Sequence, residues 1–334
     1  MSIEIERFDS DSRGRWNGLV ERSPHSTPFH RYEALEVLAE DSSTELHPLV
    51  GFKGQEPVGI LPVFGLSRGP ISTAFSPPPD LKVSYLGPAL LNFEKLKRRK
   101  GEQRHEGFIA ACVEYLDAEW NPNFTQLRTG PWYEDPRPFG WNEFDVDIAY
   151  TYVVDLTPDP ETLLKSFSSD ARRNATNEVD ADVEITIGSR RALTRIITQV
   201  TERHARQGES YKLAPETVAK LYERLGAERV RPYVCTVDGA FVGGVVTIED
   251  DRTIYRWQGG AKPETDVPIN DRLDWHIMTD AMDRGVDRYD LVGANNQRLC
   301  GYKAKFAPDL YTYYSIHHNT PGMGLVSRLY KQLR

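Results

Sequence analysis

The chain has 334 residues, of which 39% are hydrophobic and 27% are charged, and its formal net charge is −8. These values are typical of a globular protein with a sizeable core, organised as two domains or as one large one. They argue against a membrane-spanning chain, because no run of about 18 apolar residues occurs, and against a chain with the overall basic surface that binds duplex DNA.

The N-terminal residues, MSIEIERFDSDSRGRW, are polar and acidic and lack the apolar stretch of a secretory signal. The three cysteines, Cys112, Cys235 and Cys300, lie far apart and show no CxxC or other metal-binding spacing. Such cysteines are typical of a reduced, cytoplasmic protein. We therefore expect a cytoplasmic chain without a bound metal.

In the first half of the chain, Thr27 can cap a helix, and Tyr32, Leu35 and Leu38 follow it at helical spacing. A short basic run, KLKRRKGEQR at 95–104, is interpreted either as a solvated approach to a helix or as a grip on phosphates. In chain order we expect a helix at 27–41, two strands within 47–66 around a turn at 53–56, a proline-rich loop and short strand within 71–91, a helix at 105–120, a strand at 124–130 and a loop at 131–141.

The second half has clearer signals. Asp238–Gly239 predicts a tight hairpin turn, and Gly226 and Gly285 are expected to end helices. Asn270 is expected to cap the helix that Gly285 ends. In chain order we expect a strand at 150–156, polar helices within 157–181, a strand at 182–188, helices at 189–208 and 214–227, two or three strands up to 261, a helix at 270–285 and strands at 286–293 and within 300–316.

Four segments together resemble the FemAB family of aminoacyltransferases, which are built from two GNAT-like domains. The segments are STPFHRYEALEVL, LLKSFSSDARRNATNEVDADVEI, the stretch from TIYRWQGG to YDLVGAN, and GYKAKFAPDL. The resemblance covers most of 150–316 and, more weakly, 20–140. It implies an α/β fold of the α+β type, with two tandem domains of mixed sheets flanked by helices, at 1–149 and 150–316. A C-terminal helix within 317–334 could pack back on the first domain.

The sequence departs from the family pattern in informative ways. Tyr302 stands where the family usually has Phe, and Ala307 stands where it usually has Gly. Acetyl-CoA-dependent members of the superfamily hold the pyrophosphate on a glycine-containing loop at a helix N-terminus. The corresponding stretch here, DVPINDRLDW at 266–275, has no glycine. This difference favours the branch that takes aminoacyl-tRNA as donor.

Lys303 is the first candidate catalytic residue, since an ammonium group can stabilise the oxyanion that forms in acyl transfer. The resemblance places it beside the reacting carbonyl and the terminal ribose or phosphate of the donor. The alternative is a lysine that protects an edge strand from pairing. In a regular strand Lys305 would point the opposite way.

Further candidates come from the same resemblance. Arg172 and Arg173 would hold phosphates of donor or acceptor, unless they belong to a solvated helix face. Asp290 would orient the attacking amine or accept its proton, unless it caps a turn at the end of its strand.

Three more residues are candidates for substrate binding. Tyr302 precedes the lysine, Trp257 would line the substrate site unless it packs in the core, and Asn295 would contact substrate unless it only forms a turn.

The sequence predicts a cytoplasmic transferase that moves an acyl or aminoacyl group to an amine. We expect the acceptor to be a cell-envelope or sugar-nucleotide precursor, the donor to be the acceptor end of aminoacyl-tRNA, and no cofactor beyond the donor. One alternative is an acetyl-CoA- or acyl-CoA-dependent N-acyltransferase on the same fold. A second is a binding protein that has lost the chemistry.

Overall fold

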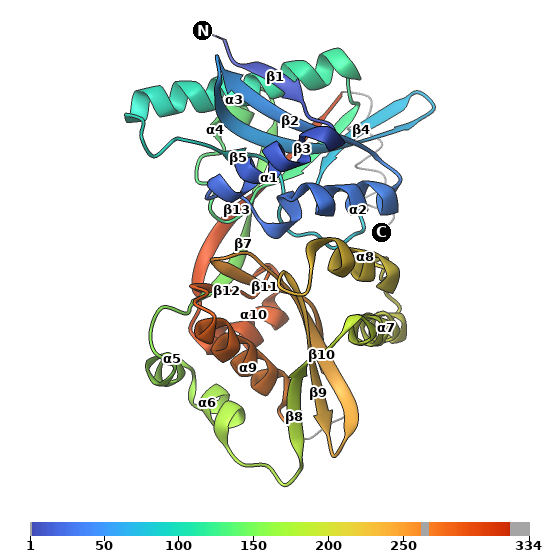
Figure 1. Ribbon diagram of the computed structural model, residues 1–334, viewed down its shortest axis with the longest axis vertical. Helices are drawn as coiled ribbons and strands as arrows, with labels where there is room; N and C mark the ends of the chain where they lie inside the picture. The colour runs from blue at the N-terminus through green and yellow to red at the C-terminus, as the bar shows by residue number, and fades with distance from the viewer. Residues whose placement is uncertain (1, 262–266, 321–334) are drawn as a thin grey trace. The chain divides into compact units, whose positions relative to one another are not determined.

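Figure 1 shows the computed structural model, which describes residues 2–261 and 267–320. The chain forms two compact units. Unit 1 consists of Met1–Ala149 together with the segment that begins at Thr312, and unit 2 consists of Tyr150–Tyr311. The strand that returns to unit 1 runs to Asn319. Residues 317–319, where a C-terminal helix was expected, belong to this strand. The rest of that prediction, from 321 on, lies outside the described residues.

Unit 1 is a sheet with helices on both sides (Figure 1). Its strands follow the order β1-β2-β3-β4-β6-β13, and all described neighbours are antiparallel except β4 and β6. The strands are β1 (Glu4–Arg7), β2 (Glu45–Lys53), β3 (Glu56–Arg68), β4 (Ile71–Ser76), β5 (Ala89–Leu90, paired with β3), β6 (Phe124–Arg128) and β13 (Asp309–Asn319). The helices are η1 (Ser10–Ser12), α1 (Arg13–Arg22), η2 (Pro28–His30), α2 (Tyr32–Ser42), α3 (Arg98–Glu119) and α4 (Arg137–Trp141).

Helix α3 packs on the sheet of unit 1 through Phe108, which is fully buried. A Cβ atom at Gly59 on β3 would lie 2.6 Å from the Phe108 ring, so the strand can approach the ring only because this residue is glycine. The helix begins at Arg98, earlier than expected, and therefore includes most of the basic run. Arg104 of that run pairs with Glu56 at 2.9 Å.

Within unit 2 the sheet has the strand order β7-β12-β11-β10-β9-β8, and only β11 and β12 run parallel among the described pairs. Helices α7 and α8 lie on one side of it and α9 on the other (Figure 1). The strands are β7 (Asp145–Asp155), β8 (Val183–Ile187), β9 (Val230–Val237), β10 (Ala240–Glu249), β11 (Thr253–Ala261) and β12 (Arg288–Asp290). The helices are α5 (Pro160–Ser166), α6 (Ser169–Thr176), α7 (Arg190–Arg206), α8 (Pro215–Leu225), α9 (Ile269–Asp283), α10 (Gln297–Lys303) and η3 (Ala304–Phe306).

The turn and helix-end signals of unit 2 are confirmed. Asp238 and Gly239 have φ values of 50° and 74°, as a tight hairpin turn requires. Gly226 follows α8 with a φ of 90°, and Gly285 follows α9 with a φ of 77°. Helix α7, expected at 189–208, buries its apolar face at Leu193, Ile196, Ile197 and Val200.

Three local predictions are wrong. The strand expected in the second half of 300–316 is confirmed as β13, but the edge-strand setting considered for Lys303 and Lys305 is wrong. Residues 300–306 form α10 and η3, because the Asn296 side chain accepts the N–H of Leu299 and begins a helix. Asn270 does not cap α9, whose N-cap is Pro268. The stretch 131–141, expected as a loop, contains the short helix α4.

Strands β11 and β12 pair for three residues only. The pairing ends at Tyr255 and Asp290, whereas β11 continues to Ala261. The chain after Asp290 follows β7 instead, where Leu291 N–H donates to the Tyr152 carbonyl at 2.9 Å. The two strands therefore part at the carboxyl end of β12, and in sheets with parallel strands such ends commonly carry the ligand site.

Candidate active site at the end of strand β12

The chain leaves β12 through a strained turn. Val292 has a φ of 53°, which is rare for a β-branched residue, and Gly293 follows with a φ of 85°. Asp290 Oδ1 accepts the N–H of Val292 at 2.7 Å and the hydroxyl of Thr151 at 2.7 Å. Thr151 Oγ1 in turn accepts the N–H of Gly293 at 2.9 Å. Asp290 is fully buried, and its carboxylate fixes the conformation of this turn through these hydrogen bonds.

Lys303, the last residue of α10, binds the carbonyl oxygens of the same turn. Its Nζ donates to the carbonyl oxygens of Val292 at 2.8 Å and Gly293 at 2.7 Å. The residue is only 8% exposed. An ammonium group has three N–H donors, so these two bonds, the ones that Nζ donates within residues 2–261 and 267–320, leave one for a ligand. Since Lys303 lies in a helix, the interpretation of this residue as a guard on an edge strand is wrong.

The surroundings lower the pKa of Lys303 to about 8, chiefly because burial disfavours the charged form and secondly because Arg256 is a nearby positive charge. Asp290 and Asp274 act in the opposite direction. With this pKa the protonated form of Lys303 predominates at pH 7. The group is therefore a cation at neutral pH that a modest rise in pH neutralises.

A buried carboxylate, Asp274 of α9, supports the helix that carries Lys303. It accepts hydrogen bonds from Arg256 Nε at 2.7 Å, from the Tyr289 hydroxyl at 2.6 Å and from the Tyr302 hydroxyl at 2.5 Å. Burial, followed by the charge of Asp274, raises the pKa of Tyr302 well above its ordinary value. Tyr302 is thus a fixed hydrogen-bond donor that anchors α10 to α9.

Sequence reasoning missed Asp274 and Arg256. One signal was available: in NDRLDW, Asp271 and Asp274 are three residues apart and so share one face of a helix. Both acids are buried. Two acidic residues on the buried face of a helix require hydrogen-bond donors or cations as partners. Arg256 and Tyr302 are partners of Asp274, and Asp271 has partners of its own.

Further cations lie near this network. The pKa of Arg203 on α7 is lowered, first by burial and then by the positive charge of Arg256, with smaller effects from Arg206 and Arg298. A Cβ atom at Gly260 would lie 3.3 Å from Arg203 Nη1, so this guanidinium lies against the bare backbone of β11. Arginines brought together in this way repel one another and attract anionic ligands.

The first turn of α9 already holds an anion of the protein itself. Asp271 is 3% exposed, and its Oδ2 accepts from Asn174 Nδ2 at 2.5 Å. Its Oδ1 forms an ion pair with Lys305, whose Nζ also lies 4.2 Å from the centre of the Tyr302 ring. A carboxylate at this position satisfies the positive end of the helix dipole.

The remaining predicted residues occupy different settings. Asn295 binds the backbone of Tyr150, accepting its N–H at 2.9 Å and donating to its carbonyl at 3.0 Å. Trp257 on β11 is 5% exposed. Arg172 and Arg173 are exposed on α6, where Arg172 Nη1 donates to the Lys165 carbonyl at 2.8 Å.

The structure thus brings Lys303, Asp290 and Tyr302 into one buried network, with Asn295 on the adjoining loop. It leaves Arg172 and Arg173 outside that network, although α6 itself adjoins the end of α10. Ser168, which caps α6, donates its N–H to the carbonyl of Lys305 at 2.9 Å.

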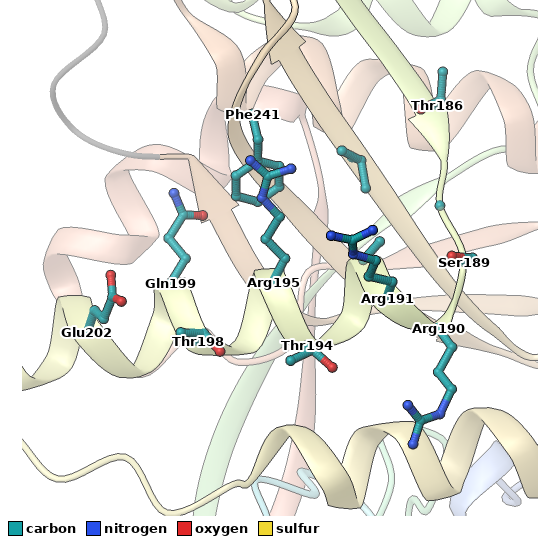
Figure 2. Close-up of a pocket in the computed structure, with 13 residues that line it drawn as sticks. Thr186, Ser189, Arg190, Arg191, Thr194, Arg195, Thr198, Gln199, Glu202 and Phe241 are labelled. Atoms are coloured by element: carbon teal, nitrogen blue, oxygen red, sulfur yellow. The ribbon is translucent and has the colours of Figure 1, made fainter.

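A separate open pocket of about 1280 Å³ lies beside α7, and none of the predicted site residues lines it (Figure 2). Over residues 2–261 and 267–320, no cluster of three or more His, Cys, Asp or Glu side chains could bind a metal ion. None of the helices in those ranges has the length and apolar character needed to cross a membrane.

Comparison with known protein families shows that residues 165–304 match the acetyltransferase (GNAT) domain family. A search among curated protein sequences finds no match. Among solved structures, FemX superposes with a TM-score of 0.71 at 9% identity, covering 93% of this chain and 96% of FemX.

Two other solved structures share the fold over nearly the whole chain. The C-terminal domain of a putative lysylphosphatidylglycerol synthetase from Agrobacterium fabrum gives a TM-score of 0.53 at 12% identity, covering 95% of this chain and 94% of that domain. A conserved protein of unknown function from Bacteroides thetaiotaomicron gives a TM-score of 0.57 at 12% identity, covering 94% and 99%. At these identities the likeness shows the fold alone, a mixed α/β fold that this chain shares with FemX.

Proposed function

We propose that this chain, which carries a GNAT domain over residues 165–304, is an acyltransferase that moves an aminoacyl group from aminoacyl-tRNA to an amine acceptor. We further propose a cell-envelope or sugar-nucleotide precursor as the acceptor. The observation that carries the proposal is the setting of Lys303. Its buried ammonium group has one N–H that is not used within the described residues. It lies where β11 and β12 part, near the positive charge of Arg256.

In the proposed reaction the acceptor nitrogen attacks the ester carbonyl of the donor. A C–N bond forms, the ester C–O bond breaks, and the proton of the amine leaves with the departing ribose oxygen. The oxyanion of the tetrahedral intermediate takes the third N–H of Lys303. The proposed mechanism is direct attack without a covalent enzyme intermediate.

The other residues of the site have supporting roles in this proposal. Asp290 and Thr151 fix the turn at Val292 against which Lys303 is held. Arg172, exposed on α6, would contact phosphate of the donor or acceptor. The cations around Arg203 and Arg256 would attract the polyanionic donor despite a net charge of −8.

The choice of an aminoacyl-tRNA donor over an acyl-CoA rests on Asp271. Asp271 and its partner Lys305 already occupy the first turn of α9, so a pyrophosphate could bind there only by displacing this carboxylate. The resemblance of the sequence to the FemAB aminoacyltransferases also supports this choice. Acyl-CoA-dependent N-acylation remains the second candidate, because the GNAT domain is the feature that both activities share.

The first experiment measures binding of radiolabelled aminoacyl-tRNA and of acetyl-CoA to the wild-type protein, Lys303→Ala and Lys165→Ala. Lys165 is a matched control, since its side chain is 69% exposed and pairs only with Glu161 in the described structure. Salt-sensitive tRNA binding that Lys303→Ala weakens and Lys165→Ala leaves intact would support the proposal.

Two results would contradict it. Tight acetyl-CoA binding without tRNA binding would assign the protein to the acyl-CoA-dependent class. Binding of neither donor, with Lys303→Ala altering only stability, would leave a binding protein that has kept the fold.

A further inference from the structure

The open pocket beside α7 lies wholly within unit 2 and apart from the residues discussed so far. Helix α7 forms one wall, from Arg190 to Glu202, and strands β8 to β10 form the other, with Thr186 and Phe241 among the lining residues (Figure 2). Its volume of about 1280 Å³ is sufficient for a ligand of nucleotide size.

Two arginines one helical turn apart give this pocket a positive charge. Arg191 and Arg195 are spaced i, i+4 and therefore share one face of α7, an arrangement that destabilises a helix when nothing neutralises it. The Arg195 guanidinium lies 4.2 Å from the centre of the Phe241 ring, which holds it against the pocket wall. Neighbouring Arg190 turns instead to Glu223 of α8, at 2.5 Å.

Neither Arg191 nor Arg195 forms an ion pair within 2–261 and 267–320, and Glu202 is the only acidic residue that lines the pocket there. Glu202 lies more than a helical turn beyond Arg195, towards the C-terminus of α7. The N-terminal half of the pocket thus contains two cations beside the positive end of the α7 dipole, and both favour a bound anion.

Gln199 supplies an independent sign of a ligand. It lines the same pocket and is only 7% exposed. Its Nε2 donates to the carbonyl oxygen of Val242 at 3.0 Å, and because a carbonyl can only accept, this bond fixes the orientation of the amide. Its Oε1 is buried and has no hydrogen-bond partner in the described structure. A buried acceptor without a donor is costly, and native proteins seldom leave one so.

We infer that this pocket binds a phosphorylated small molecule of nucleotide size. Arg191 and Arg195 bind its phosphate groups, and an N–H or O–H group on its organic part donates to Gln199 Oε1. The inference does not depend on the proposed transferase reaction, because it uses none of the residues around Lys303.

The test is a calorimetric titration of the full-length protein with three probes: ADP, inorganic pyrophosphate and adenosine. The variants are Arg191→Gln/Arg195→Gln and Gln199→Met, which keeps the length of the side chain. Arg98→Gln is the matched control, since Arg98 is 85% exposed on α3 of unit 1. Lys303→Ala separates this pocket from the candidate active site.

We expect wild-type protein to bind ADP and pyrophosphate. The double arginine variant should bind both at least about tenfold more weakly, because charge-assisted hydrogen bonds are lost. Gln199→Met should weaken ADP by about tenfold and leave pyrophosphate almost unchanged, since only ADP carries the organic donor groups. Arg98→Gln and Lys303→Ala should bind both probes as wild type does.

Three results would overturn the inference. The first is no binding of ADP or pyrophosphate at millimolar concentration. The second is binding that the double arginine variant retains, which would place the anion elsewhere. The third is adenosine binding as tightly as ADP, which would show that the phosphates contribute nothing.

Discussion

The ammonium group of Lys303 lies 2.8 Å from the carbonyl oxygen of Val292, whose φ of 53° is unfavourable for a β-branched side chain. The lysine thus stabilises a backbone conformation that the valine opposes. Functional sites often store backbone strain in this way, with the surrounding contacts holding it in place. The relationship ties the geometry of the turn to the charge state of one side chain.

Val292→Gly should therefore stabilise the protein. Left-handed backbone costs a non-glycine residue about 1–2 kcal/mol, and glycine loses roughly 0.5–1 kcal/mol through the freedom of the unfolded chain. The net gain in the free energy of unfolding should be about 0.5–1 kcal/mol, measured by urea denaturation. Gly54→Ala, at a φ of 63° with open space around it, should show the opposite sign. A loss of stability in Val292→Gly would show that the turn is not strained.

Lys303→Met should reduce both stability and transfer activity. Two buried carbonyl groups lose their donor, at about 1–3 kcal/mol for each buried group left unsatisfied. If Lys303 also stabilises the oxyanion, the barrier rises by about 2.7–4 kcal/mol, a loss of roughly 10²–10³ in kcat. Single-turnover rates measured well below the melting temperature separate the two effects. A rate unchanged in folded Lys303→Met would restrict the lysine to its structural role.

The pKa of Lys303 predicts opposite responses of activity and stability to pH. As pH rises through about 8, the ammonium loses its charge, and transfer should slow. Stability should change the other way. Burial lowers this pKa from 10.5 to about 8, so between these values the unfolded chain binds more protons than the folded one, and the free energy of unfolding gains a contribution that rises with pH.

Denaturation of wild type and Lys303→Met across pH 7–11 tests this expectation. The stability of wild type relative to the variant should increase between pH 8 and 10.5, the interval set by the folded and unfolded pKa values of Lys303. A difference that stays flat or falls across this interval would mean that the folded protein does not lower the pKa.

Asp274→Asn should be strongly destabilising. Arg256 would lose its buried counter-ion, and removing one member of a buried ion pair typically costs about 3–5 kcal/mol. The pKa of Lys303 should also fall further, since Asp274 is one of the charges that raise it. Thermal unfolding gives the first quantity and the pH dependence of the transfer rate gives the second. Asp283→Asn, exposed on the same helix, should leave the stability and the pKa unchanged. An equal effect of this control would show that the loss does not depend on the contacts of Asp274.

Gly59→Ala should destabilise unit 1 by about 1–3 kcal/mol, because the new methyl group would overlap the Phe108 ring in a close-packed core. Phe108→Leu should recover part of the loss in the double variant, which a double-mutant cycle measures. Gly18→Ala on α1, with nothing within 4 Å, should instead stabilise the helix. Additive effects of the two core substitutions would show that the residues do not share the space.

The sequence patterns were most informative where local chemistry decides the structure. The Asp238–Gly239 hairpin and the apolar face of α7 depend on turn preference and on helical periodicity, which are visible in a few neighbouring residues. The strand in the second half of 300–316 was predictable, whereas the helix that carries Lys303 was not, because the capping role of Asn296 went unrecognised.

The candidate site was predictable only in part. Lys303, Asp290 and Tyr302 follow from a resemblance in sequence, but Arg256 is brought to Asp274 by a contact between a strand and a helix. The unpartnered Gln199 Oε1 could not be foreseen either, because it depends on how α7 packs on β10. Periodicity along the chain does not report such tertiary pairings.

The division of the chain has a consequence for its synthesis. Unit 1 is built from two stretches of sequence, Met1–Ala149 and the segment from Thr312, and all of unit 2 lies between them. Strand β13, which pairs with β6 from Ser315 to Asn319, leaves the ribosome after unit 2 has been made. Domains usually fold as units during translation, with the N-terminal one first. Here the first unit to begin is the last to be completed, and until β13 has been made, the edge of β6 that pairs with it stays open.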